Sequence, residues 1–262
     1  MVNTKDRSFF IDPESLPFSK IETIVEPNAS VLIVAPHPDD ETLGCGGAIA
    51  LLRQLDVAVK VLIVSDGTKS HPNSKIYPPT ALKELRERES LAALAVLGVA
   101  PNSVTFLGMP DGAVPNLDRE IGSRDGGTKR GKFERAIALC QQYLKNIKPS
   151  TVFLPWRNDP HPDHRACWQL VVTAIKNANN HPHIIEYPIW DWDTEQRGDF
   201  PESIVAWRFD IDSVLELKKK AIAKYQSQIS DLIKDDPQGF RLTPQMLQNF
   251  TQPWEIYLKA KL

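Results

Sequence analysis

A run of five apolar residues from Val31 to Ala35, ended by Pro36, constrains the fold of this chain more than any other stretch. An unbroken apolar run is typical of a strand that is buried on both faces, as in a parallel sheet. Similar short runs recur along the chain, and the segments between them have the spacing of helices. We therefore expect buried strands at residues 31–35, 57–64, 104–107, 151–154, 184–187 and 204–211.

The intervening segments predict helices and two long loops. Helices are expected at residues 42–55, 80–97, 133–148, 164–177 and 214–229. Strands that alternate with helices favour an α/β fold, here a Rossmann-like, doubly wound and mostly parallel sheet with flanking helices. The loops at residues 65–79 and 108–132 are long enough to indicate a functional role. We see no repeat or linker and expect one domain over residues 1–262, with residues 1–29 as an extended lead-in.

Composition narrows the class of protein. The chain has 42% hydrophobic and 24% charged residues and a formal net charge of -2, so no basic excess points to nucleic acid. No apolar run approaches the roughly 20 residues of a membrane helix, and the N-terminus lacks the apolar core of a signal peptide. Three scattered cysteines, Cys45, Cys140 and Cys167, favour reduced thiols and a cytoplasmic location. The oligomeric state has no signature in the sequence.

Two short motifs carry the residues with the most chemical information, Pro36-His37-Pro38-Asp39-Asp40-Glu41 and His161-Pro162-Asp163-His164. Each follows a predicted buried strand, and ligands of open parallel sheets bind outside the carboxyl ends of the strands. Imidazoles and carboxylates are zinc ligands, and a catalytic zinc site keeps three protein ligands and one open position for water. The six histidine and aspartate side chains exceed what one metal needs, which leaves groups for acid–base work.

Each motif also has a structural interpretation. A single His-Pro-Asp sequence is usually a turn, and Asp39 or Asp40 could cap the following helix. Two further aspartates, Asp66 and Asp111, follow the second and third predicted strands. Because one rule of the fold brings all four loops to the same edge, the set predicts a site more strongly than any single motif does.

At these residues the sequence resembles the PIG-L (LmbE-like) family of zinc-dependent deacetylases, which act on N-acetylglucosamine-type sugars. Both motifs match those of the family. The similarity extends to Arg86-x-x-Glu89, to the segment from Leu107 to Gly112, and more loosely to Lys220-x-x-Ala223-x-Tyr225-x-Ser227-Gln228. It covers about residues 31 to 232.

The resemblance implies a role for each motif residue. His37, Asp40 and His164 would bind one zinc ion, although Fe²⁺ or another divalent ion remains open because two imidazoles and a carboxylate do not select zinc. Asp39 would be the general base that activates the bound water. His161 would stabilise the oxyanion, with Asp163 orienting and charging it through a hydrogen bond. The expected substrate is a small N-acetylated sugar or glycoconjugate.

The substrate-binding residues are Arg86 and Asp111, which the resemblance places against sugar hydroxyls. Arg86 could instead form an ordinary helix-surface pair with Glu84 or Glu89, and Asp111 could be a turn residue before Gly112. Glu41 is expected to support the motif loop.

Other residues receive structural interpretations. His71 is expected to be a solvated loop histidine, and the run Lys218-Lys219-Lys220 a solvated helix face. Packing is the first interpretation of Trp156, Trp190 and Trp192, with stacking on a sugar ring as the alternative.

Three alternatives to a sugar deacetylase stay open. The first is a deacetylase or amidase that acts on a nonsugar N-acyl compound. The second is a catalytically silent family member that binds sugar. The third is a nucleotide-binding module suggested by Gly44-Cys45-Gly46-Gly47, which fits poorly because its glycine spacing is not G-x-G-x-x-G.

Overall fold

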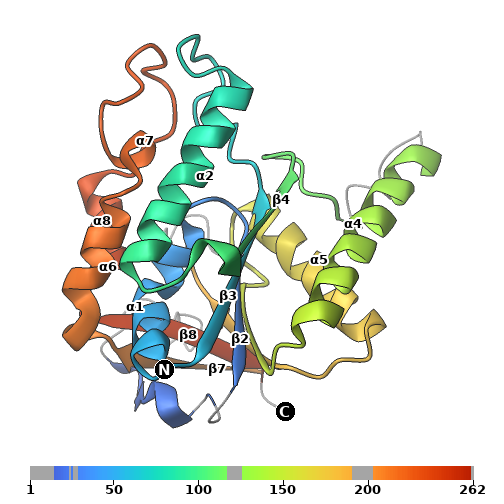
Figure 1. Ribbon diagram of the computed structural model, residues 1–262, viewed down its shortest axis with the longest axis vertical. Helices are drawn as coiled ribbons and strands as arrows, with labels where there is room; N and C mark the ends of the chain where they lie inside the picture. The colour runs from blue at the N-terminus through green and yellow to red at the C-terminus, as the bar shows by residue number, and fades with distance from the viewer. Residues whose placement is uncertain (1–14, 24, 26–28, 117–125, 191–202, 261–262) are drawn as a thin grey trace, which may run out of the picture.

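The computed structural model describes residues 15–23, 25, 29–116, 126–190 and 203–260, and Figure 1 shows its elements. The strands are β1 (Phe18–Ser19), β2 (Ser30–Ala35), β3 (Ala58–Ser65), β4 (Val104–Met109), β5 (Thr151–Pro155), β6 (His183–Tyr187), β7 (Ile204–Asp210) and β8 (Trp254–Ala260). The α-helices are α1 (Asp40–Gln54), α2 (Pro79–Val96), α4 (Gly126–Ile147), α5 (Pro162–Asn177), α6 (Leu215–Ile222), α7 (Gln226–Ile229) and α8 (Pro244–Phe250).

The strands form one eight-stranded sheet in the order β1-β7-β8-β6-β5-β2-β3-β4. Strands β2 to β6 pair in parallel, as do β1 and β7, while β8 runs antiparallel to both β6 and β7. The chain winds outward from β2 through β3 to β4 and then returns to β5 on the other side of β2. The switch in winding direction therefore falls between β2 and β5, where doubly wound sheets bind their ligands. The expected α/β fold is confirmed.

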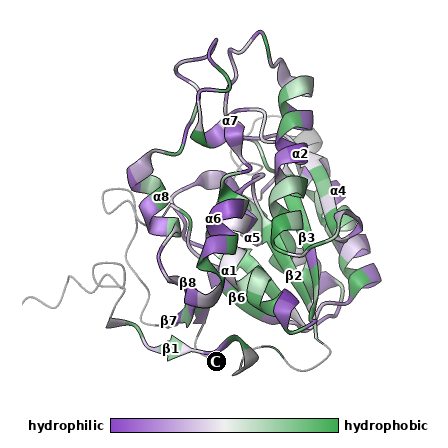
Figure 2. Ribbon diagram, turned by 60° about the vertical axis from the view of Figure 1, so that its left-hand side comes forward, coloured by the Kyte–Doolittle hydropathy of each residue, from purple (hydrophilic) through white to green (hydrophobic). Residues whose placement is uncertain are grey.

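Helices cover both faces of the sheet because the central strands are apolar on both sides. Val31 and Ile33 face a core that includes side chains of α1, α2 and α6, while Leu32 and Val34 face a core that includes side chains of α4 and α5. Figure 1 shows these two groups of helices on opposite sides of β2 and β3, and Figure 2 shows the strands as the hydrophobic centre. Both cores fix the position of the carboxyl ends of β2 and β5.

Three expected elements differ from the structure. Part of the lead-in at residues 1–29 is an edge strand, β1, which pairs with β7, while residues 1–14 lie outside the described part. Helix α4 begins at Gly126, inside the expected loop 108–132. The single helix expected at residues 214–229 is divided into α6 and α7, since Tyr225 turns inward and its hydroxyl donates to Glu41.

The glycine run in α1 is explained by close packing. A Cβ atom at Gly44 would lie 2.3 Å from Tyr187, and one at Gly47 would lie 2.5 Å from Ile211. At Gly46 the Cβ would lie 3.0 Å from the side chain of Lys218. The run therefore lets β6 and α6 approach α1, which gives these glycines a structural function in place of nucleotide binding.

Lys218 contradicts the expected solvated face. Its side chain is buried, and its ammonium group lies 2.7 Å from Glu255 of β8. Glu255 also accepts hydrogen bonds from the backbone N–H groups of Gly47 and Ala48, at 2.6 and 2.8 Å. The prediction failed for Lys218 because β8, which supplies its partner, had not been expected, whereas Lys219 and Lys220 are exposed as predicted.

Among the residues that the structure describes, no helix is both long and apolar enough to cross a membrane. All three cysteines are buried and free.

Candidate metal centre and active site

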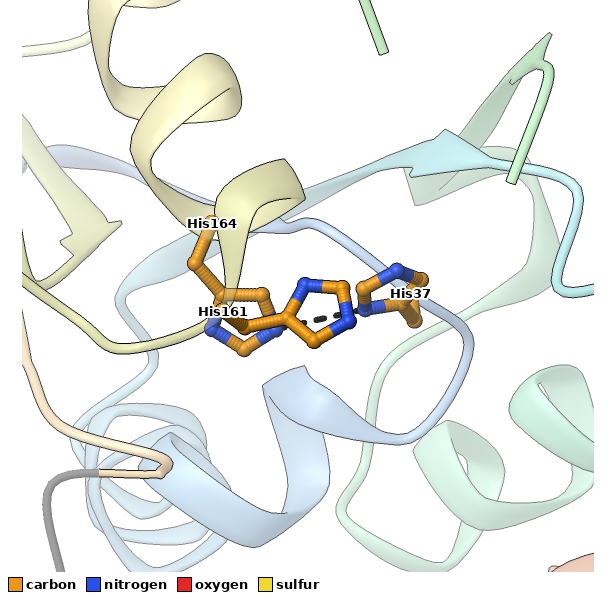
Figure 3. A group of neighbouring side chains, drawn as sticks. All are labelled: His37, His161 and His164. Atoms are coloured by element: carbon orange, nitrogen blue, oxygen red, sulfur yellow. Dashed lines mark hydrogen bonds between the residues drawn. The ribbon is translucent and has the colours of Figure 1, made fainter. Parts of the chain in front are cut away.

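The two predicted motifs meet at the switch point of the sheet. His37 follows β2, whereas His161 and His164 belong to the first turn of α5, shortly after β5. Figure 3 shows the imidazole rings of His37, His161 and His164 close together. His164 is fully buried behind His37 and His161, which line a cavity of about 400 Å³. Its lining residues are His37, Asp39, Asp40, Leu43, Gly67, Lys69, Ser70, Arg86, Asp111, Pro160, His161, Pro162, Trp190, Gln228, Phe240 and Leu242.

Three donor atoms converge as a metal site requires. His37 Nδ1 and His164 Nε2 lie 3.1 and 3.2 Å from Asp40 Oδ2, and the two nitrogens lie 3.3 Å apart. Ligands at about 2.0–2.2 Å from a tetrahedral zinc ion are separated by roughly 3.3–3.5 Å. The donor triangle therefore matches the spacing of three zinc ligands. His37, His161 and His164 also lie within 4.8 Å of one another, but that spacing is a looser fit.

Both imidazoles of this triangle have a carboxylate near their other ring nitrogen. His37 Nε2 lies 3.3 Å from Asp111 and 3.5 Å from Asp163, and His164 Nδ1 lies 3.4 Å from Asp159. Carboxylates in this position orient metal-bound histidines and select the tautomer that leaves the ligating nitrogen free. Asp159 was not predicted from the sequence. The only signal was its position two residues before His161.

Besides its contact with His164, Asp159 accepts hydrogen bonds from backbone N–H groups. Its fully buried carboxylate accepts hydrogen bonds from the backbone N–H groups of His161 at 2.9 Å and Trp190 at 3.0 Å. A third such bond comes from Ile189 at 3.2 Å. Asp159 thus joins the start of α5 to the segment that follows β6, so one carboxylate holds both the metal motif and part of the cavity wall.

The carboxyl group of Asp40 stays ionised in this site, which favours the binding of a cation. Burial alone would raise the pKa of Asp40, but the charge of His164 and hydrogen bonds from both histidines hold it well below its usual range. Burial alone would lower the pKa of His164, yet Asp159 and Asp40 raise it to about 9. The site therefore keeps an ionised carboxylate, and without a metal it attracts protons, for which a divalent ion competes.

Asp39 lies beside the triangle on a strained backbone. Its φ angle is 132°, which non-glycine residues rarely adopt, and it immediately precedes α1. Its carboxylate accepts a hydrogen bond from Arg86 at 3.1 Å. Burial raises the pKa of Asp39 to about 8, against the lowering effect of Arg86. This carboxylate can therefore take up a proton near neutral pH, as a general base must.

His161 is held as a neutral donor. Its Nδ1 accepts a hydrogen bond from the backbone N–H of Asp163 at 3.2 Å, which leaves the proton on Nε2. Burial and the neighbouring His164 and His37 lower the pKa of His161 to about 4. The carboxylate of Asp163 accepts from the N–H of Gly112 at 2.6 Å. Asp163 thus contacts His161 through its backbone N–H, and its charge acts to raise the pKa of His161, so its charging role stays a prediction.

Arg86 and Asp111 line the cavity but are engaged within the protein. Arg86 is 2% exposed and donates to Asp39 and to the carbonyl oxygen of Pro38. Asp111 accepts from the backbone N–H of Lys69 at 2.8 Å and lies near His37. The alternative of an ordinary surface pair for Arg86 is therefore wrong, and its contact with a sugar stays a prediction.

Glu41 is fully buried and accepts a hydrogen bond from the N–H of Asp39 at 3.1 Å, as expected of a residue that supports the loop.

The structure contradicts the prediction for His71 and agrees with the prediction for Trp156. His71 is buried at 1% exposure, so the expected solvated side chain is wrong, and Gly239 packs against its ring. Trp156 is buried in the core as expected. Trp190 lines the cavity, and Trp192 lies outside the described residues.

The fold and this donor set define an α/β protein with a candidate mononuclear metal centre at the carboxyl edge of its sheet. The family model described as PIG-L, GlcNAc-PI de-N-acetylase, matches residues 32–175, which is more than half of the chain. The chain belongs to the PIG-L family.

Three similar proteins are named as deacetylases. A probable N-acetyl-α-D-glucosaminyl L-malate deacetylase of Bacillus subtilis is 25% identical, over 78% of this chain and 86% of that protein. The diacetylchitobiose deacetylase of Thermococcus kodakarensis is 26% identical, over 87% of this chain and 80% of that protein. The N,N'-diacetylchitobiose deacetylase of Pyrococcus horikoshii has the same fold, with a TM-score of 0.58 at 24% identity, over 78% of this chain and 72% of that one.

Proposed function

We propose that this protein is a metal-dependent N-deacetylase that removes the acetyl group from an N-acetylglucosamine-type sugar. The observation that carries the proposal is the convergence of His37, Asp40 and His164 on one point, with Asp39 and His161 beside it. Its relatives are named for deacetylation of N-acetylglucosamine-containing compounds, which supports the same bond as the target.

The residues supply the remaining steps of an amide hydrolysis. A zinc ion held by the triangle would make a bound water acidic enough to attack at neutral pH. Asp39 takes the proton of the attacking water, because Arg86 holds its carboxylate beside the triangle. His161 donates a hydrogen bond from Nε2 to the oxygen of the tetrahedral intermediate. Protonated Asp39 then delivers the proton to the amine as the C–N bond breaks, which yields acetate and the free amino sugar.

The other residues support these groups. Arg86 acts through Asp39, whose carboxylate it holds and whose charge it offsets. Asp111 serves as an orienting partner of His37, and its place in the cavity lining also leaves it available to a sugar hydroxyl. We propose zinc as the metal, with Fe²⁺ as the alternative that metal analysis decides.

Acetate release tests the proposal. The zinc-loaded protein is incubated with N-acetylglucosamine, its simple glycosides and a set of nonsugar N-acetyl amines, and its metal content is measured on the same sample. We expect acetate from the sugars, about one metal ion per chain, and loss of both in His164→Ala but not in the exposed control His181→Ala. Acetate from the nonsugar amides alone would favour the amidase alternative. Bound zinc without any turnover would favour a silent sugar-binding protein.

A further inference from the structure

The cavity has two chemically different sides. Polar and charged residues from the loops after β2, β3, β4 and β5 and from α2 form one side, which we call the polar floor. Trp190, Phe240 and Leu242 come from later segments of the chain, and we call these three residues the apolar wall. The wall carries no charge and belongs to the same cavity as the metal site. A ligand that reaches the metal therefore lies beside it.

The apolar wall is held in place by backbone hydrogen bonds. The N–H of Trp190 donates to Asp159 at 3.0 Å, that of Phe240 to the carbonyl oxygen of Ser70 at 2.6 Å, and that of Leu242 to the carbonyl oxygen of Gln228 at 2.8 Å. The rings of Trp190 and Phe240 meet edge to face, with centroids 5.6 Å apart. Phe240 is nevertheless 37% exposed. The wall thus presents a preformed apolar surface.

A second connection fastens the segment that carries Phe240 and Leu242 to the loop at residues 65–79. Asp235 accepts hydrogen bonds from the N–H groups of Lys75 and Ile76, at 2.6 and 2.9 Å. Asp236 accepts one from the N–H of Asn73 at 2.8 Å. Carboxylates that accept backbone N–H bonds form charge-assisted hydrogen bonds, which are stronger than neutral ones. The wall is therefore preorganised for a ligand.

Gln228, which lines the cavity, is fixed by a hydrogen bond to its neighbour Ser227. Glu89 accepts hydrogen bonds from the N–H and the hydroxyl of Ser227, at 2.7 and 2.6 Å, so the Ser227 hydroxyl proton is committed to Glu89. The amide nitrogen of Gln228 donates to the same Ser227 oxygen at 2.9 Å, which fixes the amide orientation. Its oxygen is buried without a hydrogen-bond partner in the described structure, and Gln228 lines the cavity. The Gln228 side chain is therefore held rigidly in the cavity lining, next to Leu242, whose N–H donates to the backbone carbonyl oxygen of Gln228.

The volume of the cavity leaves room beyond the sugar. At about 400 Å³ it lies within the range of roughly 300–1,000 Å³ that holds drug-sized ligands, and one acetylated pyranose fills only part of it. Once the acetyl group lies at the metal and the sugar ring over the polar floor, the remaining group that can reach the wall is the one attached to the sugar.

We propose that the apolar wall is an aglycone subsite, so that the preferred substrate is an N-acetylglucosaminide with an uncharged aglycone that presents an apolar face. This inference rests on the proposed deacetylase function and adds the class of glycoside to it.

The test compares three β-glycosides of N-acetylglucosamine, with methyl, phenyl and 4-carboxyphenyl aglycones. For the zinc-loaded protein we expect kcat/KM for acetate release to be at least about tenfold higher for the phenyl than for the methyl or 4-carboxyphenyl glycoside. In Phe240→Ala the phenyl-to-methyl ratio should fall toward one. Ile76→Ala removes an exposed apolar side chain that does not line the cavity, and it should leave the ratio unchanged.

Equal rates for the methyl and phenyl glycosides, a preference for the 4-carboxyphenyl glycoside, or an unchanged ratio in Phe240→Ala would overturn the subsite. Faster release of a longer N-acyl group, without any aglycone preference, would assign the wall to the acyl chain and also overturn it. If no glycoside releases acetate, the proposed function fails. Calorimetric binding of the methyl and phenyl glycosides to the wild type and to Phe240→Ala then tests the subsite by itself, with the same ratios expected in Kd.

Discussion

Arg86 and Asp39, 47 positions apart in the chain, form a buried ion pair at 3.1 Å directly beside the candidate metal site. The guanidinium holds the carboxylate at the edge of the donor triangle and lowers its pKa, while burial raises that pKa to about 8. The two opposing effects leave a base that can exchange a proton near neutral pH.

The first prediction concerns Asp39→Asn. The amide oxygen can still accept the hydrogen bond from Arg86, but an amide cannot take a proton from water. We expect about one metal ion per chain, as in the wild type, and a kcat lower by about 100-fold or more. Metal analysis and acetate release measure the two quantities. Asp56→Asn, on an exposed turn where Asn tolerates the positive φ angle of 56°, is the matched control. A fully active Asp39→Asn protein would remove Asp39 from the role of base.

The second prediction concerns Asp159→Asn. The carboxylate orients His164 from a ring nitrogen that does not face the metal site, so its loss should weaken metal binding by about 10–100-fold. Competition with a coloured chelator gives the dissociation constant, independently of turnover. The exposed Asp212→Asn variant should bind metal like the wild type. An unchanged dissociation constant in Asp159→Asn would show that His164 needs no partner.

The third prediction concerns the pH dependence of stability through His71. Burial lowers the pKa of His71 below its ordinary value of 6.5, with Arg241 and Arg86 acting in the same direction and Asp236 and Asp235 opposing them. The folded protein then binds this proton less readily than the unfolded chain. The stability that depends on neutral His71 is present above about pH 6.5 and is lost as the pH falls through that value.

In His71→Gln we therefore expect a smaller drop in Tm between about pH 7.5 and 5.5 than in the wild type. The comparison uses the change with pH and not the absolute Tm, because the substitution also alters packing against Gly239. His181→Gln, at an exposed position, serves as the control. Identical pH profiles for the wild type and His71→Gln would exclude this contribution.

The fourth prediction concerns the buried ion pair of Lys218 and Glu255. Lys218→Met leaves the Glu255 carboxylate buried without its cation, which should lower the free energy of unfolding by about 3 kcal/mol. Urea denaturation measures the change. The double variant Lys218→Met/Glu255→Gln should recover part of the loss, because a neutral amide is less costly to bury. A single variant as stable as the wild type would mean that water reaches Glu255.

The sequence predicted the parts of the site that depend on local pattern. Apolar runs locate β2 and β5, and the residues just after each run are brought to the switch point by the rule that governs parallel sheets. The two motifs could therefore be placed together from the sequence, and the resemblance to the PIG-L family selected His37, Asp40 and His164 from them. The sequence pattern did not reveal contacts between residues that lie far apart in the chain. Asp159 and Lys218 act through residues on other elements, and neither has a periodic signal of its own.

The same reason explains the elements that were missed. Strand β8 lies antiparallel between β6 and β7, and nothing in its own sequence says that it enters the sheet there. The break between α6 and α7 depends on Tyr225 reaching Glu41 across the molecule. The helix propensity of the residues does not fall at that break, so the tertiary contact of Tyr225 ends the helix.

Asp235 and Asp236 fasten the segment with Phe240 and Leu242 to the loop at residues 65–79, so part of the apolar wall is attached independently of the proposed metal site. All the proposed metal and acid–base residues fall within residues 32–175, whereas Trp190, Phe240 and Leu242 fall after them. The segment with Phe240 and Leu242 supplies none of the proposed metal ligands. If the apolar wall is the aglycone subsite, exchanging that segment with both aspartates kept should change the selectivity and leave the proposed acid–base residues in place.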